Sequence, residues 1–149
     1  MSTRSRIGIK DPKSGKIRSV YCHSDGYFEG VGLMLHRHYR DTAKIKALIA
    51  LGDLSTLDKQ VAPPAGVPHH FDGPRAEGVT VAYHRDRSEE LIKSEISKGE
   101  AGFLAATDAC SGEFAYLWDL DKWRVWCLHE GSPIQGSELV VEMVTEVLS

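Results

Sequence analysis

The sequence predicts an α+β fold, a single domain in which three to four helices pack against an antiparallel or mixed sheet of about five strands. Two pairs of strand-like segments are each joined by a short turn, another apolar run lies between the pairs, and segments with helical periodicity separate them. The chain has 149 residues, of which 42% are hydrophobic and 26% are charged. These values are typical of a globular protein with one sizeable core, so we expect one domain over residues 1–149.

The first two strands should form a hairpin at residues 6–9 and 17–21, because β-type residues there flank a turn with Asp-Pro and Ser-Gly pairs. Successive side chains of a strand point to opposite faces. Tyr21 and His23 should therefore share one face of the second strand, whereas Cys22 points to the other. This places His23 beside Tyr21 at the end of the strand.

A helix should follow this strand directly. Asp25 and Gly26 break the strand, and Asp25 is a good cap for a helix that starts near Tyr27. Gly30 and Gly32 each lower helix stability by about 1 kcal/mol relative to alanine, so they indicate either a close approach by another group or a helix that begins later. The apolar face of this helix has the spacing i, i+3, i+4 and i+7, at Val31, Met34, Leu35 and His38.

The middle of the chain should contain a second helix, a long loop and a third strand. Asp41 is placed to cap the helix at residues 42–51, and Gly52 to end it. Residues 62–77 are rich in Pro and Gly, which regular helices and central strands exclude, so they should form a mobile connecting loop. The alternating run at residues 79–84 predicts the strand.

The rest of the chain should contain a hairpin between helices. Residues 88–98 have the spacing of a solvent-facing helix, and residues 101–109 fit either a helix or a loop. Aromatic-rich segments at residues 113–118 and 123–128 flank a short turn, which is typical of a hairpin. A final helix should run from Ser137, its cap, to residue 148, with an apolar stripe at Val140, Met143, Val144 and Val147.

Three residues whose side chains could act in catalysis or bind a ligand lie at the junction of the second strand and the first helix: Cys22, His23 and Asp25. A helix N-terminus favours an anion, so the junction is a candidate site for a phosphate, a small molecule or a metal, with His23 as base or ligand and Asp25 orienting it. A nucleophilic Cys22 is a further candidate catalytic group, although His23 points to the opposite face and a distant histidine would have to activate it. The structural alternative is that Asp25 caps the helix, Cys22 packs in the core and His23 is a polar residue at the sheet edge.

Other side chains suit recognition. The candidate binding residues are aromatic, acidic, histidine and arginine side chains of the junction, the long loop and the end of the third strand: Tyr21, His23, Asp25, Tyr27, His38, His69, His70, Arg85 and Arg87. His38 is alternatively a packed residue that caps the last carbonyls of its helix, and the arginines are alternatively a solvated strand end. A binding platform is one expectation for the three tryptophans, Trp118, Trp123 and Trp126. The alternative is that two of them fill the core against the final helix.

Composition narrows the function classes. The net charge is −3, so a generally basic surface for nucleic acid is not expected. Cys22, Cys110 and Cys127 are an odd number without CxxC spacing, which favours reduced thiols and argues against a structural zinc site. No segment has the length and apolar character of a membrane span, and the N-terminus lacks the apolar core of a secretory signal. We therefore expect a cytoplasmic protein with no cofactor and no metal.

Several segments carry a resemblance that covers most of the chain. They are residues 2–9, the Tyr-Cys-His-x-Asp-Gly-Tyr pattern at residues 21–27, residues 30–32, 38–39, 48–55, 78–83 and 113–118. In these the chain resembles small proteins of unknown function encoded by bacteriophages and prophages. The resemblance implies an accessory protein that acts in the cytoplasm of the bacterial host.

The sequence leaves several functions open. The first hypothesis is a phage accessory protein that binds a host protein. Such a protein could inhibit an antiviral defence of the host, as an anti-CRISPR protein does. It rests on the resemblance, the acidic balance and the lack of a complete catalytic set. The alternatives are a small hydrolase or nucleotide- or metal-binding protein that uses Cys22, His23 and Asp25, and a structural component of the virion.

Overall fold

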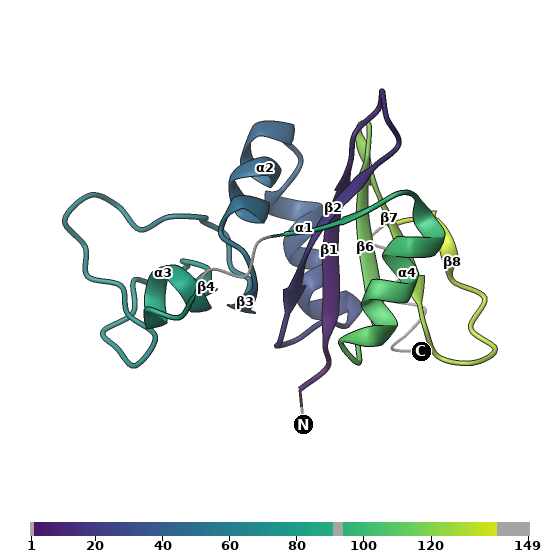
Figure 1. The fold of residues 1–149 in the computed structure, drawn as a ribbon. Helices are drawn as coiled ribbons and strands as arrows, with labels where there is room; N and C mark the ends of the chain where they lie inside the picture. Colours follow the sequence, from purple (N-terminus) through teal and green to yellow (C-terminus); the bar gives the residue numbers. More distant parts are fainter. Residues whose placement is uncertain (1, 91–93, 140–149) are drawn as a thin grey trace.

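One mixed sheet of eight strands organises the protein. The computed structural model, shown in Figure 1, describes residues 2–90 and 94–139. The strands follow the order β4-β3-β2-β1-β6-β7-β8, and β5 also pairs with β2. The α+β architecture is as predicted, but the expected number of about five strands was too small. The strands are β1 (Ser5–Lys10), β2 (Ile17–Cys22), β3 (Leu54–Thr56), β4 (Val81–Ala82), β5 (Glu95–Ser97), β6 (Phe114–Asp119), β7 (Lys122–Cys127) and β8 (Gln135–Glu138).

The two predicted hairpins are confirmed and form the centre of the sheet. β1 pairs antiparallel with β2, and β6 pairs antiparallel with β7. A parallel pairing of β1 with β6 joins the hairpins. The turn between β1 and β2 extends beyond the neighbouring strands at the top of Figure 1.

Three strands on the β2 side of the sheet, β3, β4 and β5, are short and depend on partners far away in the sequence. The outer edge of β2 is divided between two of them: Ile17, Arg18 and Ser19 pair with β5, whereas Cys22 pairs with Leu54 of β3. β4 has two residues and pairs with β3. Segments this short have too few residues to show alternation in the sequence.

Helices cover both faces of the sheet (Figure 1). A π-helical turn (Phe28–Gly32) leads into α1 (Leu33–His38), and α2 (Thr42–Ala50) follows. The larger core lies between these elements and the sheet, where Tyr39, Phe28 and Leu48 are buried. On the opposite face α4 (Glu100–Ala109) covers a smaller cluster of Ile17, Phe103, Ala115, Leu117 and Trp126. α3 (Tyr83–Arg87) lies beside the long loop at the left of Figure 1.

All three tryptophans are buried, with exposed fractions of 4% for Trp118, 1% for Trp123 and 4% for Trp126. Trp118 and Trp123 pack in the larger core, where the indole N–H of Trp123 donates to the carbonyl of Tyr39 at 2.7 Å. Trp126 packs under α4 with Phe103. The tryptophan binding platform is therefore excluded.

The segment around Asp25 differs from the prediction. Asp25 does not cap a helix: its φ is +55°, and Tyr27 occupies the position before the π-helical turn without a side-chain cap. Gly30 lies against the backbone of Asp25, whose carbonyl oxygen a Cβ at this position would strike. The close approach predicted for Gly30 is thus confirmed. His38 was placed on the apolar face, but it is exposed because α1 ends there.

Other elements also need correction. The predicted strand at residues 79–84 is limited to Val81–Ala82, because α3 begins at Tyr83. Residues 95–97 of the predicted helix at 88–98 are strand β5, while 91–93 lie outside the described residues. Ser137 lies in β8 and so does not cap a helix; residues 140–149, where most of the predicted final helix falls, also lie outside the described residues.

The predictions for α2 and for residues 101–109 can also be compared with the structure. The α2 helix has the expected cap, since the carboxylate of Asp41 accepts from the N–H of Ala43 at 3.4 Å. Residues 101–109, which fitted either a helix or a loop, belong to α4. None of the helices within residues 2–90 and 94–139 combines the length and apolar character needed to cross a bilayer.

Candidate functional site

Cys22 is fully buried in the larger core. Burial raises the pKa of its thiol to about 12, because the thiolate would be separated from water. A nucleophilic cysteine needs the opposite change, a lowered pKa in a partly exposed position. The geometry of Cys22 is that of a packing residue.

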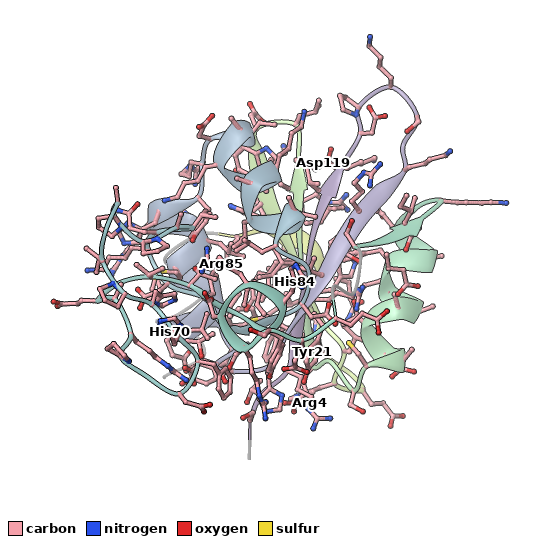
Figure 2. The ribbon with its side chains drawn as sticks, turned by 60° about the vertical axis from the view of Figure 1, so that its left-hand side comes forward. Arg4, Tyr21, His70, His84, Arg85 and Asp119 are labelled. Atoms are coloured by element: carbon pink, nitrogen blue, oxygen red, sulfur yellow. The ribbon has the colours of Figure 1, made fainter. Side chains whose placement is uncertain are left out.

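His23 and Tyr21 lie together on one face of β2, as the strand alternation predicts. The Tyr21 hydroxyl is 2.6 Å from Nδ1 of His23, and the two rings meet edge to face. Burial raises the pKa of Tyr21, with the charge of Arg4 opposing this change. Figure 2 shows Arg4 and Tyr21 at the same end of the sheet.

A small hollow of about 330 Å³ adjoins this pair. It is lined by Tyr21, Asp53, Tyr83, Glu89 and Glu90. The carboxylate of Asp53 accepts from the N–H of Tyr21 at 3.1 Å, and burial raises its pKa. Asp53, which was not among the predicted site residues, is thus the acidic residue bonded to Tyr21.

Asp25 is turned toward Tyr27. The Tyr27 hydroxyl donates to the Asp25 carboxylate at 3.1 Å, and this bond raises the pKa of Tyr27. Among the described residues, no hydrogen bond joins Asp25 to His23. Cys22, His23 and Asp25 therefore have separate partners and do not assemble around one reacting atom.

The long loop at residues 62–77 is attached to the fold through a buried network. Asp86 accepts two hydrogen bonds from Arg85, at 2.8 and 2.9 Å, and one from the N–H of Ala82 at 2.7 Å. Arg85 also donates to the carbonyls of Val61 and Thr80, both at 2.6 Å. Burial alone would raise the pKa of Asp86, but these hydrogen bonds and the charge of Arg85 outweigh it and hold the pKa below its ordinary value of 3.8.

His69 joins the loop to this network. Its Nδ1 accepts from the N–H of Ala76 at 2.9 Å, so the proton of the neutral ring is on Nε2, which donates to the carbonyl of Thr80 at 3.0 Å. The same Nε2 is 3.5 Å from the Asp86 carboxylate. These contacts do not fit a mobile connector, which was the sequence expectation for this loop.

The remaining predicted binding residues lie apart from one another. Arg85 lies within the loop network, and His70 is exposed on the loop; both are labelled in Figure 2. Arg87 is exposed, and its guanidinium stacks on Phe71 at 4.6 Å from the ring centre. His38 is exposed at the end of α1. Within the described part of the chain, no three His, Cys, Asp or Glu side chains gather as a metal site requires.

A second hollow, larger than the one beside Tyr21, lies elsewhere and was not predicted from the sequence. Its floor is a row of directly paired residues on four neighbouring strands: Trp118 of β6, Ile9 of β1, Arg18 of β2 and Ile96 of β5. The turn at residues 11–16 and helix α2 form its walls. We call this hollow, of about 730 Å³, the basic groove.

The basic groove combines cations with exposed apolar side chains. Lys16, Arg18 and Lys46 are exposed, and no carboxylate of residues 2–90 and 94–139 lies within 4.0 Å of their charged groups. Ile96 and Leu120 line the same hollow with exposed fractions of 54% and 67%. The sequence shows the individual Lys and Arg residues of the groove. It does not show that they come together, because their grouping depends on strand register.

Comparison with protein-family models, with curated proteins and with solved structures gives no match to this chain.

Proposed function

We propose that this protein acts by binding another protein through the basic groove. The observation that supports this is the grouping of exposed apolar side chains with cations that no described carboxylate neutralises. Exposed apolar surface is characteristic of interaction sites, and charges at such a surface select and orient the partner. The groups of the predicted catalytic junction, in contrast, are engaged with separate neighbours.

The resemblance to phage and prophage proteins indicates the kind of partner. We place the protein in the cytoplasm of the bacterial host, where it would bind a host protein. Inhibition of an antiviral defence, for example of a CRISPR effector, is one role that such binding serves. This part of the proposal rests on the resemblance alone.

Affinity capture with chemical cross-linking from a bacterial host lysate, followed by reconstitution from purified components, tests the proposal. We expect one captured host protein to form a stable complex with the purified chain in size-exclusion chromatography. The double variant Arg18→Glu/Lys46→Glu should capture less of that protein, whereas its matched control outside the groove, Arg37→Glu/Lys122→Glu, should capture as much as the wild type. If no captured protein forms a complex after purification, the proposal fails.

A second candidate is a small hydrolase or nucleotide-binding protein that uses the hollow beside Tyr21. It is favoured by the raised pKa of Asp53, since perturbed carboxylates often mark functional sites. His23 would act as the base in this case. A nucleotide-binding screen with the wild type and with His23→Ala separates the candidates, and recovery of the protein in purified virions would instead support a structural role.

A further inference from the structure

We propose that the basic groove binds an acidic segment of the partner, in which carboxylates are flanked on both sides by apolar side chains. This inference rests on the proposed function and specifies the chemistry of its partner. It follows from the order of cationic and apolar side chains along the groove, from the length of its floor, and from the lack of exposed aromatic side chains among the described residues of its lining.

The floor of the groove fits a short peptide segment. The paired row from Trp118 to Ile96 crosses four strands, and neighbouring strands are about 4.8 Å apart, so the row is about 14 Å long. An extended chain advances about 3.4 Å per residue and covers this length with about five residues. The groove therefore has the size of a linear segment rather than of a folded surface.

One cation lies within this row, between Ile9 and Ile96, and two more line the same hollow. Arg18 is part of the row, Lys16 lies two residues earlier, and Lys46 projects from α2. The acidic residue of the wall does not neutralise them, because the carboxylate of Asp11 accepts from the N–H of Lys13 at 3.0 Å and from the hydroxyl of Ser14 at 2.9 Å. An incoming carboxylate would find unneutralised partners.

The apolar groups lie toward the two ends of the groove. Ile96 is at the β5 end, and Leu120 follows β6 at the other end. Each is more than half exposed. If the partner carries an apolar side chain on each side of its acidic residues, these two side chains would cover Ile96 and Leu120 and bury apolar surface on both molecules.

Among the described residues, the lining of the groove offers no exposed aromatic surface on which nucleic-acid bases could stack. Trp118 is the aromatic residue of its lining, and it is 4% exposed with its indole N–H donated to the hydroxyl of Thr42 at 3.1 Å. Single-stranded nucleic acid is bound through basic grooves that carry such stacking surfaces. These observations favour an acidic peptide.

A titration followed by amide and indole NMR signals tests this inference. The probe is a capped peptide, Leu-Glu-Asp-Glu-Leu, and its control is Leu-Gln-Asn-Gln-Leu. We expect shifts of the Trp118 indole and the Arg18 and Ile96 amides with the acidic peptide, at least about tenfold weaker binding of the neutral peptide, and weaker binding when ionic strength rises from about 0.01 M to about 0.15 M.

The variants Arg18→Glu/Lys46→Glu and Arg37→Glu/Lys122→Glu form a matched pair, because they change the net charge equally but only the first pair lines the groove. The first should lose peptide binding about tenfold or more, and the second should retain it. Equal losses, shifts away from the groove, or displacement of the peptide by a single-stranded DNA at lower concentration would each overturn the inference.

The two proposals can fail separately. If the purified host partner binds the wild type but not Arg18→Glu/Lys46→Glu, while the acidic peptide does not bind the groove, the proposed function stands and this inference fails. If the acidic peptide binds the groove but no host protein forms a complex, the chemistry of the groove stands and the proposed function fails.

Discussion

The charged side chains that attach the loop at residues 62–77 are engaged with one another, whereas those of the basic groove face solvent. Arg85 donates four hydrogen bonds to the carboxylate and carbonyl oxygens around it. Arg18 has the same chemistry but no carboxylate partner in the described chain. The difference follows from local position. Arg85 is beside the buried Asp86, whereas Arg18 is exposed near the start of β2, on a face whose later residues Val20 and Cys22 are buried.

The difference separates charges that stabilise the fold from charges that remain available to a partner. A buried ion pair is costly to break because the remaining group is left without water and without a partner. An exposed unpaired cation contributes little to stability, yet it attracts an oppositely charged molecule over several ångströms. The loop network should therefore respond to substitution through unfolding, and the groove through binding.

Asp86→Asn should give the largest loss of stability. The asparagine removes the negative charge that faces Arg85 and His69, so we expect the free energy of unfolding to fall by about 3 kcal/mol. Urea unfolding at neutral pH measures the change. Asp72→Asn, an exposed change in the same loop, is the control and should change stability by less than about 0.5 kcal/mol. Similar values for the two variants would show that the network does not stabilise the loop.

The contribution of Asp86 should also disappear in acid. Its pKa is lower in the folded protein than the ordinary value of 3.8, so folding favours the charged form. The stabilisation is complete above the ordinary pKa and is lost as the pH falls through the lower, folded-state pKa. Urea unfolding of the wild type and of Asp86→Asn between about pH 7 and about pH 3 should show their difference shrinking toward acid. A constant difference would contradict the assignment.

The sequence predicted those features that local pattern determines. Both central hairpins follow from alternation around a turn, and α2 follows from its cap and its apolar spacing. β3 and β5 were missed because three residues form a strand only when a distant strand is beside them, and β4 was predicted but with too many residues. Asp25 fits a cap in the sequence, but its backbone turns to positive φ so that Gly30 can approach it.

The candidate site shows the same division. The contact of Tyr21 with His23 was predictable, since residues two apart in a strand share a face. The basic groove was not predictable, because Trp118, Ile9 and Ile96 meet only through the register of the sheet. The same holds for His69 and Asp86, which lie on different segments and meet through the fold of the loop.

Phe71→Leu should give a smaller effect than Asp86→Asn. The ring of Phe71 is covered by two guanidinium groups, of Arg75 at 5.2 Å and of Arg87 at 4.6 Å, and leucine keeps an apolar side chain but removes the aromatic face. Exposed contacts of this kind contribute about 0.5 kcal/mol each or slightly more, so we expect a loss of about 1 kcal/mol in urea unfolding. Val67→Ala at the exposed loop surface is the control, and an equal loss there would remove the argument for stacking.

Neutralising the groove should have the smallest effect on stability. Lys46 and Lys44 lie on the same helix, but Lys44 donates to the carbonyls of His38 and Lys59, both at 2.7 Å, and lies over the ring of Tyr39. Lys46 has no such partners among the described residues, so Arg18→Gln/Lys46→Gln should change the free energy of unfolding by less than about 0.5 kcal/mol, whereas Lys44→Gln should lower it by about 1 kcal/mol. Urea unfolding of the three proteins at low ionic strength measures both. A loss for Arg18→Gln/Lys46→Gln as large as that for Lys44→Gln would mean that the groove cations hold the fold together, and the contrast between paired and available charges would be wrong.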